Sequence, residues 1–188
     1  SDGKMVENIE DLFFEFLRVA DDIRPKVIIA ENVKGLTIGE AKEYFNKIQN
    51  TFEDIGYDVV AKVLDSRYFG ISQTRTRVFF IGVRNDITEK AGLNFMTIGN
   101  VFPQELPDVV PLKDALIDLE YDEQEVKYLT DKLRKLTIGE LKRIQSLPDD
   151  FKLTGKWNQK SERIGRMVPP LMMKAIADSV YNKVLKEI

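Results

Sequence analysis

The chain has 188 residues, with 28 Lys and Arg against 31 Asp and Glu, and a net charge of −3. Hydrophobic residues make up 43% and charged residues 31%, which is typical of one globular domain with a core. The absence of Cys and His excludes disulfides, Cys/His zinc sites, thiol nucleophiles and imidazole bases, and we predict no metal site. No apolar run approaches the ~18 residues of a membrane span and no signal peptide is visible, so we expect a cytoplasmic protein without membrane contact.

The chain opens with a predicted helix and a predicted buried strand. Apolar residues at i, i+3, i+4 spacing predict an amphipathic helix over residues 6–20. The apolar run after Pro25 predicts a strand over residues 26–31, buried on both faces. Glu31 and Asn32 come at its end, where open α/β sheets bind their ligands. From this stretch alone, a turn cap and a functional pair are equally good interpretations.

The tetrad Thr-Ile-Gly-Glu occurs twice, at residues 37–40 and 137–140. Thr followed three residues later by Glu is the signature of a capping box. The first copy predicts a helix that continues to about Ile55, where Gly56 ends it. The second copy predicts a helix over residues 137–145.

Two further strands are predicted at residues 57–65 and 77–84. The link over residues 66–76 is too short for a helical crossover, so this pair is expected to be antiparallel. The order helix, strand, helix, strand, strand therefore predicts a mostly parallel sheet with one reversed strand near an edge.

The second half of the chain is less regular. Residues 85–110 show no periodicity, and short helices are predicted at 112–119 and 122–133. Residues 152–166 are predicted to be a basic loop, and a long amphipathic helix follows Pro169-Pro170.

The link between the last two strands is rich in arginine. Residues 67–84 contain four arginines and no acid, and alternation places Gln73, Arg75 and Arg77 on one side. Arginine and glutamine on a loop suit carbonyl oxygens, phosphates or base edges. The alternative is a basic surface hairpin that pairs with the acidic first helix.

These residues resemble a known family. Glu31-Asn32-Val33 followed by Gln73-x-Arg75-x-Arg77 is similar to the pattern of the C5-cytosine-specific DNA methyltransferases. Residues 134–151 and 163–170 resemble two later blocks of that family, in the same order. The resemblance covers most of residues 9–187 and identifies the chain as the C-terminal portion of such an enzyme.

The resemblance implies an α/β fold. We expect part of a Rossmann-like S-adenosylmethionine-dependent methyltransferase core, a mixed sheet with flanking helices, and a short irregular insert. Residues 1–84 would form the C-terminal half of the catalytic core, and residues 85–133 a shortened target-recognition-like insert. Residues 134–188 would form helices that return to the core.

The resemblance also implies a reaction, namely methyl transfer from S-adenosylmethionine to C5 of a flipped-out cytosine in double-stranded DNA, as in restriction-modification. In this family a cysteine thiolate adds to C6 of the ring, and negative charge develops on N3 and O2. By resemblance, Glu31 would donate or share a proton at N3, and Arg77 would stabilise the negative charge that develops on O2. Arg75 would organise the pocket beside Arg77. Asn32 and Gln73 would bind the substrate. The cofactor contacts would come from Gly165, Arg166, Met167 and Val168.

The chain also departs from the family pattern. It contains neither the Pro-Cys block nor the glycine-rich cofactor loop, and Arg166-Met167 stand where Asn and a small residue are usual. We therefore expect no activity without the missing N-terminal half or a complementary subunit. Two alternatives stay open: a degenerate DNA- or partner-binding module that uses residues 152–166 and the arginine-rich link between the last two strands, and an RNA cytosine methyltransferase relative. A bacterial or phage origin would imply association with the nucleoid.

Overall fold

A computed structural model describes residues 3–37, 39, 41–119 and 135–188, with the side chains of the first helix described from Leu12 onward. The chain divides by its contacts into two compact units. Unit 1 comprises residues 1–64, 76–103 and 178–188, and unit 2 comprises residues 65–75 and 104–177. The functional division at residues 84 and 133 stays a proposal.

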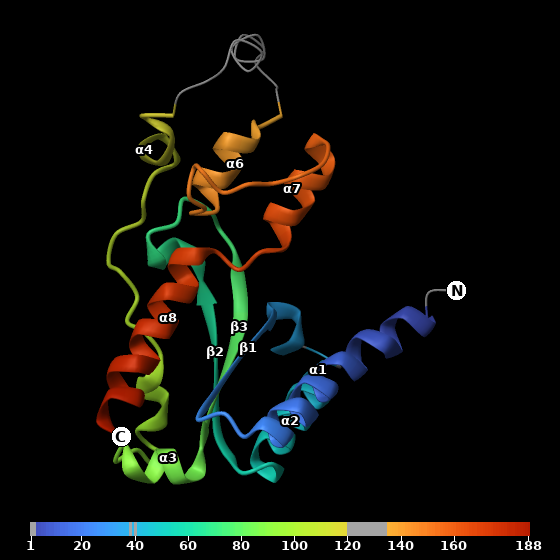
Figure 1. The fold of residues 1–188 in the computed structure, drawn as a ribbon, viewed down its shortest axis with the longest axis vertical. Helices are drawn as coiled ribbons and strands as arrows, with labels where there is room; N and C mark the ends of the chain where they lie inside the picture. The colour runs from blue at the N-terminus through green and yellow to red at the C-terminus, as the bar shows by residue number, and fades with distance from the viewer. Residues whose placement is uncertain (1–2, 38, 40, 120–134) are drawn as a thin grey trace. The chain divides into compact units, whose positions relative to one another are not determined.

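Three strands form the sheet of unit 1: β1 (Val27–Val33), β2 (Tyr57–Asp65) and β3 (Thr76–Arg84). Their order is β1-β3-β2, and β1 pairs antiparallel with β3. β2 leads to the end of the sheet from which β3 returns, so β1 and β2 run in the same direction (Figure 1). Because β3 runs opposite to both of its neighbours, the described three-stranded sheet is antiparallel, and the predicted mostly parallel sheet is not found among these strands; the reversed strand lies between β1 and β2.

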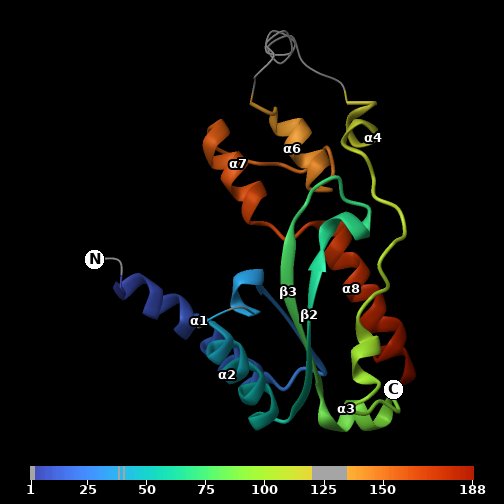
Figure 2. The same cartoon turned by 180° about the vertical axis from the view of Figure 1, so that it is seen from behind.

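Two helices cover one face of this sheet, α1 (Gly3–Ile23) and α2 (Ala41–Asp54), and both views show them side by side (Figures 1 and 2). The short 3-10 helix η1 (Lys34–Thr37) joins β1 to α2. Gly56, with φ of +82°, ends the α2 segment in the left-handed conformation that favours glycine. The buried apolar residues of this face are Leu17, Ala20, Ile28, Ala30, Leu36, Ile48, Phe52, Tyr57, Val78 and Phe80.

Helix α2 packs very close to β3 at Gly82. A Cβ atom at this position would lie 2.7 Å from Cδ1 and Cε1 of Phe52. Phe52 is fully buried and stacks on Phe80, with 6.3 Å between the ring centroids. The glycine in β3 is therefore required by packing, because no other residue leaves room for the Phe52 ring.

The other sheet face carries Phe79, Ile81 and Val83, all fully buried. After β3 come α3 (Asn85–Lys90) and η3 (Ile98–Val101). The last part of α8 (Pro170–Lys183) belongs to unit 1, where Ser179 Oγ donates to Val101 O at 2.7 Å. The chain closes with η4 (Leu185–Glu187).

Unit 2 contains short helices and loops: η2 (Ser66–Phe69), α4 (Leu112–Leu116), α6 (Ile138–Ile144), α7 (Trp157–Arg166) and the first part of α8. The capping box predicted for α6 is confirmed. Thr137 Oγ1 accepts from the Glu140 backbone N–H at 3.1 Å, and Glu140 Oε2 accepts from the Thr137 N–H at 2.7 Å.

The prediction of a loop over residues 152–166 is wrong, because α7 occupies its last 10 residues. Gln159 Oε1 accepts from the Lys156 backbone N–H at 2.9 Å and satisfies a free donor at the start of the helix. Of its side chains Ile164 alone is buried, so the apolar periodicity that predicts helices is too weak here. Residues 85–110 are likewise not wholly irregular, since they contain α3 and η3.

Two predictions lie outside the described residues. The first capping box includes Ile38 and Glu40, and the predicted helix over residues 122–133 falls within the undescribed segment. Among the residues that are described, no helix combines the length and apolar character needed to cross a bilayer.

Candidate active site

Glu31 and Arg77 meet at the end of β1 in unit 1. The strand register places Val33 opposite Arg77, and Glu31 lies two residues before Val33 on the same face. Diagonal neighbours of this kind are within reach of long side chains across an antiparallel pair. Arg77 Nε lies 2.9 Å from Glu31 Oε1, so the two side chains that were predicted to be catalytic are in direct contact.

The environment of this pair is half-buried, with side-chain exposures of 22% for Arg77 and 26% for Glu31. Glu31 Oε1 is itself buried, and no donor is aligned for a hydrogen bond to it, so the contact is an ion pair of good distance and poor angle. Arg77 Nη1 donates to Thr76 O at 2.8 Å, which anchors the guanidinium to its own strand. A guanidinium has five N–H donors, so these contacts leave others for a ligand.

Asn32 has a structural contact beside this pair. Its Oδ1 accepts from the Val33 backbone N–H at 2.8 Å. The side-chain oxygen therefore satisfies the last backbone donor of β1, where the strand ends. The predicted substrate-binding role of Asn32 stays a prediction.

The arginine loop (residues 66–75) lies in unit 2 and is held by a buried serine. Ser66 is fully buried; its Oγ donates to Gln73 O and accepts from the Arg75 backbone N–H at 3.0 Å. The Ser66 N–H in turn donates to Arg75 O at 3.0 Å. The loop backbone that carries Gln73 and Arg75 is thus closed on itself by three hydrogen bonds.

The side chains of the arginine loop contact the ends of α6 and α7. Arg75 Nη1 donates to Gly165 O at 2.8 Å. Gln73 Nε2 donates to Gln145 Oε1 at 2.9 Å, and Gln145 Nε2 donates to Met167 O at 2.6 Å. Within unit 2, Arg75 therefore contacts Gly165 directly, and Gln73 is connected to Met167 through Gln145. Gly165 and Met167 are two of the residues predicted to contact the cofactor.

Gln145 is a residue that the sequence did not single out. It directly follows α6, is fully buried, and uses both ends of its amide to join Gln73 to Met167. A buried amide leaves few signs in a sequence, because a single Gln in a polar helix is unremarkable. Ser66 was missed for the same reason.

The predicted cofactor residues Gly165 to Val168 fit a ligand only in part. A Cβ added at Gly165 would meet no atom within 4 Å, so this backbone is open to close approach. The carbonyls of Gly165 and Met167 accept from Arg75 and Gln145, and Arg166 pairs with Glu162 at 2.6 Å in an exposed position. The open backbone at Gly165 fits cofactor contact, whereas the position of Arg166 does not.

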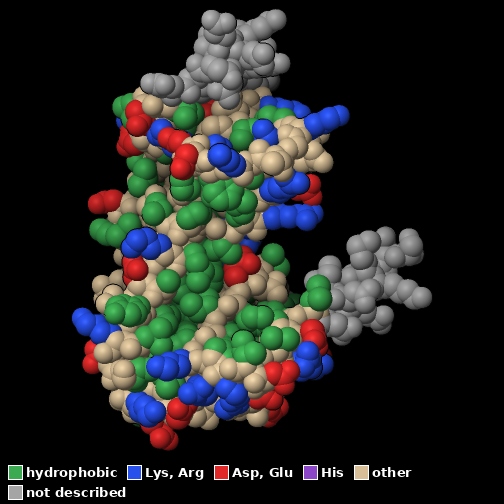
Figure 3. Space-filling model, in the orientation of Figure 1, with side chains coloured by type: hydrophobic (Ala, Val, Ile, Leu, Met, Phe, Trp, Pro, Cys, Tyr) green, Lys and Arg blue, Asp and Glu red, His purple; other side chains and the backbone are tan. Residues whose placement is uncertain are grey.

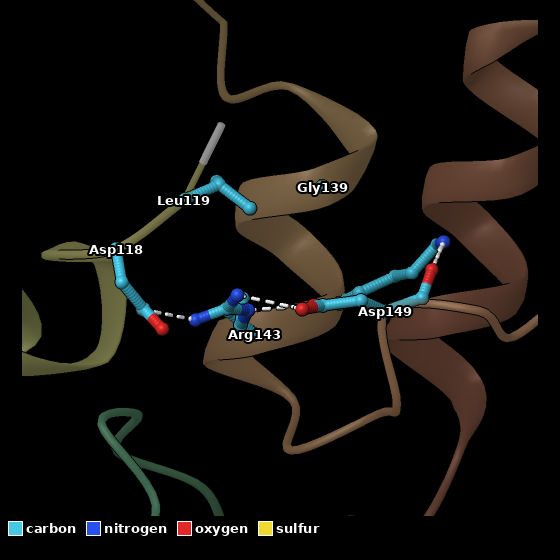
Figure 4. Close-up of a pocket in the computed structure, with 6 residues that line it drawn as sticks. Asp118, Leu119, Gly139, Arg143 and Asp149 are labelled. Carbon is cyan, nitrogen blue, oxygen red and sulfur yellow. Dashed lines mark hydrogen bonds and ion pairs between the residues drawn. The ribbon is translucent and has the colours of Figure 1, made fainter. Parts of the chain in front are cut away.

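A separate pocket in unit 2 surrounds Arg143 of α6 (Figure 4). Arg143 donates to both carboxylate oxygens of Asp149 at 2.6 Å and, through Nη1, to Asp118 at 2.5 Å. Hydrogen bonding to this guanidinium lowers the pKa of both aspartates below their usual value. The Arg143 donors are taken by two carboxylates, so this cluster links the segment after α4 to the turn after α6 and does not form an anion site. The pocket is lined by Asp118, Leu119, Gly139, Lys142, Arg143 and Asp149.

Solved structures with a similar fold are methyltransferases. A DNA modification methyltransferase encoded within a prophage of E. coli matches with a TM-score of 0.73 at 20% identity, over 93% of this chain and 74% of that chain. The S. pombe Dnmt2 methyltransferase matches with a TM-score of 0.56 at 15% identity, over 89% and 70%. The chain thus has a mixed α/β methyltransferase fold.

Sequence comparison assigns the family. The C-5 cytosine-specific DNA methylase family matches residues 2–133 and 111–182, so the chain belongs to this family. It is 27% identical over 230 residues to the type II methyltransferase M.BspRI of Lysinibacillus sphaericus, covering 90% of this chain and 54% of that protein. It is 29% identical over 225 residues to M1.HphI of Haemophilus parahaemolyticus, covering 91% and 60%. The chain therefore spans between half and two thirds of these relatives.

Proposed function

We propose that this chain forms the part of a DNA (cytosine-5-)-methyltransferase that holds the target cytosine by its N3 and O2 edge. The observation that carries the proposal is the 2.9 Å contact between Glu31 and Arg77 at the end of β1. N3 and O2 belong to adjacent positions of the pyrimidine edge, so their two partners must lie close together, as these side chains do. The complete enzyme would act on a cytosine flipped out of double-stranded DNA.

In this proposal the pair supports an addition step. When a thiolate adds to C6, negative charge moves onto N3 and O2, and the ring becomes nucleophilic at C5. Glu31 shares a proton with N3, and Arg77 donates hydrogen bonds to the developing charge on O2. S-adenosylmethionine, when bound, supplies the methyl group that C5 receives.

The nucleophile must come from elsewhere, because the chain contains no cysteine. The relatives have substantial length that this chain does not cover. We propose that a Cys-bearing polypeptide, covalently continuous or separate, completes the enzyme and that this chain alone is inactive.

Arg75 and Gln73 act in this proposal by fixing the loop that leads to Arg77. Their side chains contact Gly165 and Gln145 rather than standing free. We assign Arg75 a positioning role, in agreement with the expectation that it organises the pocket. Gln73 keeps its Oε1 for substrate, while its Nε2 is used by Gln145. Cofactor contact is proposed for Gly165 and Val168 and is disfavoured for Arg166.

The test is reconstitution. The chain is co-expressed with the N-terminal part of M.BspRI, the portion that precedes its similarity to this chain, and labelled-methyl transfer to double-stranded DNA and to tRNA is measured. Transfer to DNA that is lost with Arg77→Ala supports the proposal. Transfer to tRNA alone assigns the RNA alternative, and DNA binding without transfer in any combination supports a non-catalytic module.

A further inference from the structure

Helix α7 in unit 2 carries a stripe of cations. Lys156, Lys160 and Arg163 follow one another at spacings of four and three, so they lie along one face of the helix. In the part of the chain that the structure describes, none of these three forms an ion pair, whereas Glu162, the one acid of α7, is paired with Arg166. The stripe therefore keeps its positive charge, although the whole chain has a net charge of −3.

The stripe is held in a fixed position on unit 2. The Lys160 backbone N–H donates to Lys156 O at 3.0 Å, which closes the first turn of the helix. Arg163 Nη1 donates to Thr154 Oγ1 at 3.1 Å and also to Thr154 O, so the guanidinium is anchored to the loop that precedes α7. A guanidinium has five N–H donors, and this anchoring uses one nitrogen, so others remain for a ligand.

Trp157 brings a further cation to the start of α7. Its Nε1 donates to Leu136 O at 3.1 Å, a contact between residues 21 apart in the chain. The ammonium group of Lys135 lies 4.8 Å from the centroid of the Trp157 ring. The surface is thus built from two segments, and Lys and Arg side chains gather over α7 in the space-filling view (Figure 3). The ring itself is 36% exposed, so solvent and ligands can reach it.

We propose that this surface, which we call the α7 surface, binds the phosphate backbone of double-stranded DNA through Lys156, Lys160 and Arg163. DNA presents a regular row of negative charges, about one per 1.7 Å of helix axis, and a row of cations along one rigid helix complements it. Backbone contacts of this kind position a protein on the duplex without reading its sequence. The inference rests on the proposed function in its choice of DNA as the ligand, but it uses none of the residues assigned to the cytosine.

The α7 surface gives the chain an affinity of its own for DNA. The contacts are electrostatic and lie within one unit, so they do not depend on a cysteine, on the cofactor or on a second polypeptide. The chain alone therefore binds duplexes of unrelated sequence with similar affinity, although it transfers no methyl group.

The test titrates the full chain with a labelled DNA duplex at several salt concentrations and measures binding by fluorescence anisotropy. The logarithm of the affinity should fall linearly with the logarithm of the salt concentration. Lys156→Gln and Lys160→Gln should each weaken binding by roughly three- to tenfold at low salt and make this slope shallower by about 1. Trp157 is the sole tryptophan of the chain, so its emission reports on the surface directly and should change with the same midpoint.

A matched variant separates this surface from general charge effects. Lys113→Gln removes the same charge from an exposed position of α4 in the same unit and should leave the slope unchanged. Equal slopes for Lys113→Gln and Lys156→Gln, or Trp157 emission that does not respond to bound DNA, would overturn the proposal. Tighter binding of tRNA than of the duplex under the same conditions would overturn the choice of DNA.

Methyl transfer by the reconstituted enzyme is measured separately, so the two proposals fail separately. Transfer to DNA together with an affinity that ignores Lys156 and Lys160 overturns the α7 surface and retains the proposed function. Lysine-dependent DNA binding without transfer in any combination retains the α7 surface and overturns the proposed function.

Discussion

Glu31 and Arg77 reach each other from different strands because residues two apart on a strand share a face. Arg77 lies opposite Val33, and Glu31 is the diagonal neighbour. The register of β1 and β3 therefore determines the contact, and a shift of one residue would place the two side chains on opposite faces.

Replacing Glu31 with Gln in the reconstituted enzyme should lower the methylation rate by about 10²–10⁴-fold, because an amide cannot supply a proton. DNA affinity should change little, since the amide keeps the shape of the side chain. Single-turnover methyl transfer and a DNA-binding titration measure the two effects separately. Glu53→Gln, on the exposed side of α2, is the matched control. A rate for Glu31→Gln equal to that of the control would return Glu31 to the role of a strand-end residue.

Gln145→Leu should destabilise unit 2. Leucine fills a similar volume but leaves Met167 O and the Gln73 amide without partners, at a cost of about 1–3 kcal/mol in unfolding free energy. Urea denaturation measures the loss, with Gln104→Leu, at an exposed loop position of the same unit, as the matched control. Equal stability of the two variants would show that water replaces the amide.

At the level of elements, helices and strands that depend on neighbouring residues could be predicted from the sequence. Elements that depend on contacts distant in the chain could not. The capping box at Thr137 and Glu140 is a contact between residues three apart, so the sequence contains all of it. Strands 57–65 and 77–84 are likewise predicted from short stretches rich in β-branched and aromatic residues. α7 was missed because its composition is strongly polar and it has few apolar residues, and its contact with Arg75 comes from 90 residues away in the chain.

Gly82→Ala should destabilise the packing of α2 on β3. The added methyl group would stand 2.7 Å from the Phe52 ring, which is buried and cannot turn away freely. Overpacking of this kind costs about 1–3 kcal/mol. Gly35→Ala is the control, because a Cβ there meets nothing within 4 Å. Chemical denaturation of both variants should show a loss for Gly82→Ala alone.

The Arg143 cluster should make unit 2 sensitive to acid. Asp118 and Asp149 have folded pKa values below the usual 3.8, because Arg143 binds their charged forms. Their contribution to stability is complete above pH 3.8 and is lost as the pH falls through the folded pKa values. The melting temperature of Arg143→Met should therefore lie below that of the parent chain at pH 7, and the difference should shrink below about pH 4. A constant difference across this range would exclude the ion pairs as its cause.

The chain belongs to the C-5 cytosine-specific DNA methylase family and spans 54% of the length of M.BspRI. The family could be predicted because its motifs are short and ordered along the chain, whereas the described strands form an antiparallel sheet and not the mostly parallel one that was predicted. The division into two units could not, because unit 1 combines residues 1–64, 76–103 and 178–188, and such discontinuous contacts have no local signal.

The purified chain should transfer no methyl group from S-adenosylmethionine to DNA, because it has no cysteine to form the covalent adduct. Labelled-methyl incorporation in a preparation free of host methylases checks this, and the same assay with the M.BspRI N-terminal part is its positive control. Incorporation above the blank by the chain alone would require a different nucleophile and a different mechanism.

The hydrogen bonds from Gln73 to Gln145 and from Gln145 to Met167 both have their donors on the same side of each pair. A backbone carbonyl can only accept, so Met167 O requires the amino end of Gln145, which turns the Gln145 oxygen toward Gln73. Gln73 must then present its own amino end to Gln145, so its oxygen takes no part in this contact. The orientation of both amides is thus dictated by one peptide group, and Gln73 would offer a hydrogen-bond acceptor to any neighbour. A ligand amino group suits that position, and a ligand carbonyl does not.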